Sequence, residues 1–154
     1  MVKWMDKKVM VGIIGLIMTF GIVAASISYT ATYTVTANID ASSPLISIEL
    51  SNEAITLGAS LNGGKNNYML DLSLPAETIT EFNLLNITNI FNNNIIVNIT
   101  ITGTDANRVT IINQNPMGLM SSEVGVLRVA IDLTSLAKSS VIAFNIIINV
   151  TSTI

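Results

Sequence analysis

Residues 29–40 read YTATYTVTANID, an uninterrupted alternation of apolar and polar side chains. Tyr, Ala, Val and Ile occupy the odd positions, whereas Thr, Asn and Asp occupy the even ones. Because the side chains of a β-strand point alternately to its two faces, this period of two predicts a long strand with one apolar face. Ser43 and Pro44 follow, and proline cannot donate a hydrogen bond to a sheet, so we expect the strand to end before them.

The same alternation continues in shorter stretches to residue 150. Turns rich in Asn, Gly, Ser and Pro interrupt it about every 8–12 residues, a spacing typical of antiparallel β-domains. We expect strands at 45–50, 54–57, 68–74, 79–90, 95–102, 108–113, 124–133 and 141–150, a turn at 61–67, a loop at 114–122 and one helical turn at 134–140. The sequence therefore predicts an all-β fold, an Ig-like or jelly-roll sandwich of antiparallel sheets.

A hydrophobic segment precedes this β-rich region. Residues 9–27 read VMVGIIGLIMTFGIVAASI and carry no charge, and they follow a short segment with more Lys than Asp. This pattern predicts an N-terminal hydrophobic helix that directs export and leaves the N-terminus in the cytoplasm. Small residues favour cleavage of a signal peptide at Ser26 or Ser28. The run is close to the roughly 20 residues that span a bilayer, so a retained membrane anchor is the alternative.

These two patterns divide the chain into three parts. Residues 1–28 are a signal peptide or membrane anchor, residues 29–43 are an N-terminal strand with its linker, and residues 44–154 are the β-sandwich domain. We expect the protein to be secreted or displayed at the cell surface, with the membrane as a partner during export or through a retained anchor.

The composition excludes most enzyme chemistry. The chain has no His and no Cys, so it lacks an imidazole base, a thiolate nucleophile and the usual ligands of zinc and iron–sulfur sites. Its formal net charge is −3 and 11% of its residues are charged, which argues against binding to nucleic-acid phosphates. We expect no enzyme activity, cofactor, metal or nucleic-acid partner. Seventeen Asn, 16 Thr and 14 Ser make the surface polar instead.

Acidic residues that are close in sequence offer no stronger alternative. Paired carboxylates can perform glycosidase chemistry, and the closest pairs in the sequence are Glu49 with Glu53 and Glu77 with Glu81. With 5% aromatic residues, the chain supplies no sugar platform or apolar pocket for them, so we interpret them as surface charges. Asp105 lies in a turn-like segment without the acidic spacing of a calcium loop, and we interpret it as a turn-forming residue.

Three segments match the acceptor pattern for N-glycosylation, and they begin at Asn86, Asn98 and Asn149. About three matches are expected by chance from the amounts of Asn, Ser and Thr, so their number carries no weight. Export would bring these residues to a glycosylating system, and glycans are therefore candidate modifications at these three positions.

The first strand carries the functional hypothesis. It lies between an export segment and a Ser-Ser-Pro linker, and the unpaired backbone of such a strand can pair with the sheet of another molecule. In donor-strand complementation, the N-terminal strand of one subunit fills a groove in the next, and head-to-tail contacts of this kind propagate as a filament. Tyr29, Tyr33, Val35 and Ile39 would then be the inward anchors. The alternative is that the strand belongs to its own sandwich.

Two further stretches carry a resemblance to a known family. Residues 85–89 (LNITN), followed by 95–102 (IIVNITIT), and the closing stretch 136–146 (LAKSSVIAFNI) resemble the strands of archaeal thread and bundling-pilus subunits and of the TasA-like fibre proteins of bacterial biofilms. The resemblance extends over the exported region as a pattern. It implies a non-enzymatic filament subunit whose partner is another copy of itself, joined by donated strands.

Three other functions stay open. A type IV pilin-like subunit would keep its hydrophobic helix in the filament, but Lys7-Lys8-Val9 lacks the small residue expected after its cleavage site, and no long amphipathic helix follows. A membrane-anchored surface binding module and an envelope protein of an archaeal virus would both retain residues 9–27. The N-terminus of the mature protein distinguishes these cases from a secreted filament subunit.

Overall fold

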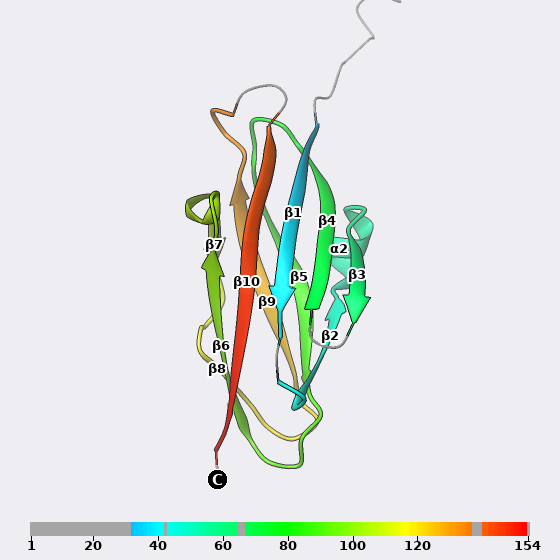
Figure 1. Ribbon diagram of the computed structural model, residues 1–154, viewed down its shortest axis with the longest axis vertical. Helices are drawn as coiled ribbons and strands as arrows, with labels where there is room; N and C mark the ends of the chain where they lie inside the picture. The colour runs from blue at the N-terminus through cyan, green and yellow to red at the C-terminus, as the bar shows by residue number, and fades with distance from the viewer. Residues whose placement is uncertain (1–31, 42, 65–66, 137–139, 154) are drawn as a thin grey trace, which may run out of the picture. The chain divides into compact units, whose positions relative to one another are not determined.

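Two β-sheets pack face to face in the part of the chain that the computed structural model describes, residues 32–41, 43–64, 67–136 and 140–153 (Figure 1). The six-stranded sheet has the order β3-β4-β1-β10-β6-β8 and contains β1 (Thr32–Asp40), β3 (Ser60–Gly64), β4 (Asn67–Pro75), β6 (Ile95–Thr102), β8 (Met117–Leu119) and β10 (Val141–Ser152). The four-stranded sheet has the order β2-β5-β9-β7 and contains β2 (Ile46–Leu50), β5 (Ile79–Asn89), β7 (Val109–Ile111) and β9 (Val124–Asp132). The predicted β-sandwich is confirmed.

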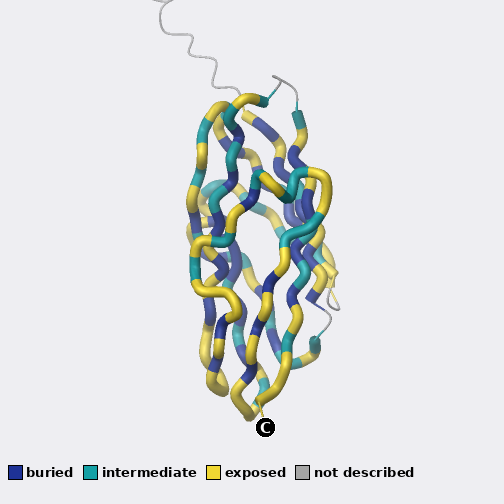
Figure 2. The backbone as a smooth tube through the Cα atoms, turned by 90° about the vertical axis from the view of Figure 1, so that its left-hand side faces the viewer, coloured by how far each residue is buried: buried dark blue, intermediate teal, exposed yellow. Residues whose placement is uncertain are grey.

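The core lies between the two sheets. Buried residues alternate with exposed ones along most strands (Figure 2), as the period of two in the sequence predicts. The buried side chains are almost all aliphatic, and Phe82 and Phe144 add aromatic rings to the same cluster. The expected hydrophobic helix lies outside the described residues, as do Ser26, Ser28 and Tyr29. In the described part of the chain, no helix is long and apolar enough to cross a membrane.

The prediction of a strand at 54–57 is wrong. Helix α2 (Asn52–Thr56) covers most of that stretch, and a 3-10 helix, η1 (Ala106–Arg108), lies between β6 and β7. Ser51 begins α2, because its side-chain oxygen accepts a hydrogen bond from the Ala54 N–H at 3.0 Å. A serine cap followed by an acidic residue in the first turn is a helix-start signal, and it overrides the short apolar run.

Two other predicted boundaries are wrong. The loop expected at 114–122 contains the short strand β8. The turn expected at 61–67 is shorter than predicted, because its first residues belong to β3, which pairs with β4 from Ser60 to Gly64. Gly63 has φ +126°, and a β-carbon there would stand 2.4 Å from the Asn67 carbonyl oxygen. Glycine is therefore required by the close approach of the two strands, whereas the sequence pattern assigns it to a turn.

The pairing of β1 with β10 also differs from the expected antiparallel sheets. The two strands run parallel, and Thr34 lies opposite Val141 at one end of the ladder and Asp40 opposite Ile147 at the other. The remaining ladders are antiparallel. A parallel pair needs a long crossover connection, and here strands β2 to β9 supply it.

The edges of both sheets are short. The edge strands β3, β8, β2 and β7 have five, three, five and three residues, which limits the backbone that they offer to another chain. At two further places, Ile99 of β6 and Ala143 of β10, a side chain bonds to backbone that no neighbouring strand pairs with on that side. Asn115 accepts from the Ile99 N–H at 2.9 Å and donates to the Ile99 carbonyl at 2.6 Å. Asp105 accepts from the Ala143 N–H at 2.9 Å, and its own N–H donates to the Ala143 carbonyl at 3.2 Å.

Candidate functional site: the position of strand β1

Strand β1 occupies the interior of the six-stranded sheet, between β4 and β10. Nine of its residues pair with β4, from Thr32 opposite Pro75 to Asp40 opposite Asn67. Seven pair with β10. Because both sides of β1 are engaged, its removal would leave two strands with open backbone edges.

The inward side chains of β1 form part of the core. Tyr33, Val35, Ala37 and Ile39 are at most 2% exposed. Burial of an aliphatic side chain such as Val35 or Ile39 contributes about 1.5–3 kcal/mol to folding. Three of the four expected anchors, Tyr33, Val35 and Ile39, therefore point inward, and their role in strand donation stays a prediction.

Two of the inward residues of β1 lie between buried neighbours on both flanking strands. Val35 lies between Leu72 of β4 and Ile142 of β10. Ala37 lies in the same way between Leu70 and Phe144. These neighbours are themselves at most 3% exposed, so any strand that occupied this position would have to present apolar side chains at the same spacing.

Tyr33 fixes the start of β1 to the rest of the domain. Its ring is buried, and its hydroxyl donates a hydrogen bond to the carbonyl oxygen of Leu136 at 3.1 Å. Leu136 belongs to the segment between β9 and β10. The phenol therefore satisfies its polar group at the end of the sandwich, and it links β1 to a connection more than 100 residues further along the chain.

The outward face of β1 presents hydroxyl and amide groups. Thr36 donates to the Ile142 carbonyl at 3.5 Å, and Asn38 donates from Nδ2 to Oδ1 of Asn145 at 3.4 Å. A shallow depression of about 600 Å³ lies beside this amide pair and is also lined by Asn62 and Met69. Its single lining carboxylate is Asp40. This face is therefore polar but nearly uncharged.

A five-residue linker, residues 41–45, joins β1 in one sheet to β2 in the other. Five residues span at most about 18 Å when extended. The Leu45 N–H donates to the side chain of Ser43 at 3.3 Å, and the Leu45 carbonyl accepts from Ile90 at 3.0 Å. The end of the linker is thus held against the domain by hydrogen bonds, whereas Pro44 supplies none from its nitrogen.

The three candidate glycosylation sites differ in their surroundings. Asn86 is half-buried on β5, between Glu49 of β2 and Val126 of β9. Asn98 and Asn149 are exposed and lie directly opposite each other on β6 and β10. The structure thus brings together two motifs that are 51 positions apart in the sequence.

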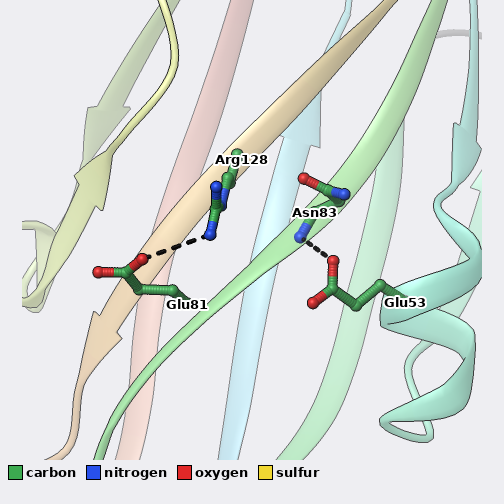
Figure 3. A network of polar contacts seen from close by, with 4 residues as sticks. All are labelled: Glu53, Glu81, Asn83 and Arg128. Atoms are coloured by element: carbon green, nitrogen blue, oxygen red, sulfur yellow. Dashed lines mark hydrogen bonds and ion pairs between the residues drawn. The ribbon is translucent and has the colours of Figure 1, made fainter.

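Two of the four glutamates considered as candidate glycosidase pairs contact the four-stranded sheet. Glu53 accepts a hydrogen bond from the Asn83 N–H at 2.9 Å, and Glu81 forms an ion pair with Arg128 at 3.5 Å (Figure 3). Both members of the ion pair are about half exposed, so it contributes little to stability. Among the residues that the structure describes, no three acidic side chains come together in a way that could hold a metal ion.

Asp132 has the one carboxyl group with a clear pKa change in the described part of the chain. It accepts hydrogen bonds from the Thr134 hydroxyl at 2.6 Å and from the Thr134 N–H at 2.8 Å. These bonds, with a smaller contribution from the charge of Arg108, hold the pKa of Asp132 below its ordinary value of 3.8. They stabilise a tight turn after β9.

Asn89 has a structural role that the sequence analysis missed. It is fully buried at the end of β5, and its Nδ2 atom donates to three carbonyl oxygens, those of Asn93, Leu119 and Met120. Its Oδ1 atom accepts from the Phe91 N–H at 2.9 Å. The available signal was its position, since a polar residue follows Leu85 and Ile87 on the inward face of the strand.

Comparison with known proteins identifies no relative: no family model matches the sequence, and no curated protein or solved structure is similar to it at a significant level. The resemblance to filament subunits therefore stays an expectation from sequence patterns, and the surroundings of β1 supply the structural support for a function.

Proposed function

We propose that this protein is a structural subunit of an extracellular filament, and that it polymerises by donating β1 to the neighbouring subunit. The observation that supports this proposal is the central position of β1. The first strand of the domain is flanked by β4 and β10 along most of its length, yet one short linker connects it to the strands that follow. It is thus a central part of the sheet, and a single linker joins it to the strands that follow.

The domain needs a strand at this position, but either its own β1 or the β1 of a second copy can fill it. A second copy offers the same inward residues at the same spacing, so Val35 and Ile39 of a neighbour would make the contacts that they make within one chain. Donor and acceptor surfaces differ in such an exchange. Contacts between unlike surfaces extend into an open filament when the rotation between subunits does not close a ring.

The linker decides how the copies are arranged. Because residues 41–45 span at most about 18 Å, the body of the donor must lie close to the end of β1 in the acceptor. The contacts made by β1 are equivalent within and between chains, so the balance depends on linker strain and on local protein concentration. A high concentration at the site of export favours exchange between subunits.

The absence of cysteine makes a clean test available. Asn38 and Asn145 are paired across β1 and β10, and cysteines at cross-strand positions are close enough for a disulfide. In N38C/N145C, oxidation of assembled protein should give a ladder of covalent oligomers on a non-reducing gel. If each chain retains its own β1, the same variant gives monomers with an internal disulfide, and strand donation is excluded.

The matched control is T100C/I147C. Thr100 and Ile147 are cross-strand partners in the same sheet, but both strands belong to the body of the domain. This variant should give internally linked monomers in either case. A ladder from the control would mean that the oxidation links neighbouring molecules at random, and the N38C/N145C result would then carry no weight.

A membrane-anchored extracellular module is the alternative function, because β1 is paired on both sides within its own chain. The mass of the mature protein distinguishes the two. A mature chain that begins near residues 27–30 fits a secreted filament subunit, whereas an intact Met1 favours the anchored module and contradicts donation along a free fibre.

A further inference from the structure

A further section of backbone edge, five residues in length, lies on β10 beyond the end of β1. β10 runs from Val141 to Ser152, but its pairing with β1 stops at Ile147. Figure 1 shows β10 continuing well past the end of β1. No strand in the described part of the chain pairs with Ile148–Ser152 on this side, although β6 pairs with the same residues on the other. In this section β10 is therefore itself an edge strand.

This edge is protected neither by side chains that bond to its backbone nor by charged residues of its own. The side chains of Asn115 and Asp105 bond to the unpaired backbone at Ile99 and Ala143. By contrast, no side chain of the described residues bonds to the backbone of 148–152 on the side of β1. The strand reads VIAFNIIINVTS and has no charged residue. An uncharged segment rich in Ile and Val on an open edge is typical of uncontrolled pairing between molecules.

Asn149 lies in the middle of this exposed section. It is exposed on the outer face of the sheet and begins the acceptor motif Asn149-Val150-Thr151, whose threonine is exposed as well. A second chain would have to lie about 4.8 Å from β10 in order to pair with it. A bulky group on Asn149 would obstruct the outward side chains of that chain.

We propose that Asn149 carries an N-linked oligosaccharide that shields the open edge of β10. The Asn149 amide nitrogen would bond to C1 of the first sugar of a lipid-linked oligosaccharide, the bond between C1 and the lipid phosphate would break, and the amide proton would leave to solvent. The lipid phosphate is the leaving group. The inference depends on export, which is part of the proposed function, and is independent of strand donation.

Asn98 is the matched control position. It begins the same kind of motif and lies opposite Asn149, but one strand further into the sheet. β10 covers one side of β6 at this point, and Asn115 holds the neighbouring Ile99 on the other. A glycan on Asn98 would therefore cover no open edge, whether or not that site is modified.

The test uses the full chain recovered from the cells that produce it. Mass spectrometry of peptides should show a glycan on Asn149 in the wild type and none at this position in N149Q or T151A. Both variants should bind several-fold more of a cross-β dye than the wild type, whereas N98Q should bind the same amount. An unmodified Asn149 in the wild type, or equal dye binding by N149Q and N98Q, would overturn the proposal.

A further variant separates edge protection from any effect of the glycan on folding. N149K also lacks the glycan, but it places a positive charge on the edge strand, which is a common natural protection against pairing. It should restore the low dye binding of the wild type. Dye binding by N149K as high as that of N149Q would show that the glycan acts in another way. The disulfide ladder of N38C/N145C is unaffected by these outcomes, so strand donation is judged separately.

Discussion

Ile39 of β1 lies opposite Ile146 of β10 in a parallel register, and both side chains are at most 1% exposed. The two residues are far apart in the sequence, because strands β2 to β9 lie between them. The contact therefore depends on the pairing of β1, which one linker connects to β2, with the last strand of the domain. This relationship underlies both the stability of the domain and the proposed exchange of β1.

Truncation of Ile39 should destabilise the domain strongly. Ile39→Ala removes a buried branched side chain from the centre of the sheet, and such changes cost about 2–5 kcal/mol of unfolding free energy. The exposed Thr34 on the opposite face of β1 is the control, and Thr34→Ala should change the unfolding free energy by less than about 0.5 kcal/mol. Denaturant unfolding monitored by circular dichroism measures both. Equal effects would mean that β1 does not occupy the sheet interior in solution.

Asn89 should be more sensitive to substitution than its surface neighbours. Asn89→Ala removes the hydrogen bonds that this side chain makes with three carbonyl oxygens and the Phe91 N–H, and a buried polar group left unsatisfied costs about 1–3 kcal/mol. Asn92→Ala changes an exposed residue of the adjoining turn and should be nearly neutral. Thermal unfolding distinguishes the two variants. A neutral Asn89→Ala would contradict the bonding seen at the end of β5.

The turn after β9 should weaken in acid. The pKa of Asp132 is lowered in the folded protein by the Thr134 hydrogen bonds, so the carboxylate stabilises the fold above its ordinary pKa of 3.8. This contribution is lost as the pH falls through the lowered, folded-state pKa. The stability difference between wild type and Asp132→Asn should therefore shrink as the pH falls from about 5 through this lowered pKa.

Chemical denaturation at several pH values measures this effect. Glu49→Gln removes an exposed carboxylate from β2 and shows the general effect of losing one negative charge. If Asp132→Asn and Glu49→Gln differ from the wild type by the same amount at every pH, Asp132 makes no specific contribution to the turn.

The sequence predicted the elements that have a long period of two. Residues 68–74, 79–90, 95–102, 124–133 and 141–150 lie in strands close to their expected bounds, because each combines alternation with clear turn residues at both ends. The misses have local causes. β8 has three residues that include Gly118, β3 contains Gly63 and Gly64, and the cap at Ser51 turns an apolar run into a helix.

The pairing of strands could not be predicted in the same way. Alternation shows which side chains share a face, but it does not show which strands become neighbours. The parallel contact of β1 with β10 and the opposition of Asn98 and Asn149 both depend on register between distant segments. The inward direction of Tyr33, Val35 and Ile39 followed from periodicity alone. The role of Asn89 could not be predicted in this way, because its partners lie in two segments, residues 91–93 and 119–120, that only the fold brings together.

The outward side chains of β1 have a consequence for the surroundings that the protein tolerates. Thr32, Thr34, Thr36 and Asn38 are hydroxyls and an amide, and Asp40 at the end of the strand is the one ionisable group among them. Hydroxyls and amides neither gain nor lose protons over the ordinary pH range, and dissolved salt screens charges rather than neutral dipoles. Apart from Asp40, the hydration of this surface therefore depends little on pH or on the salt concentration.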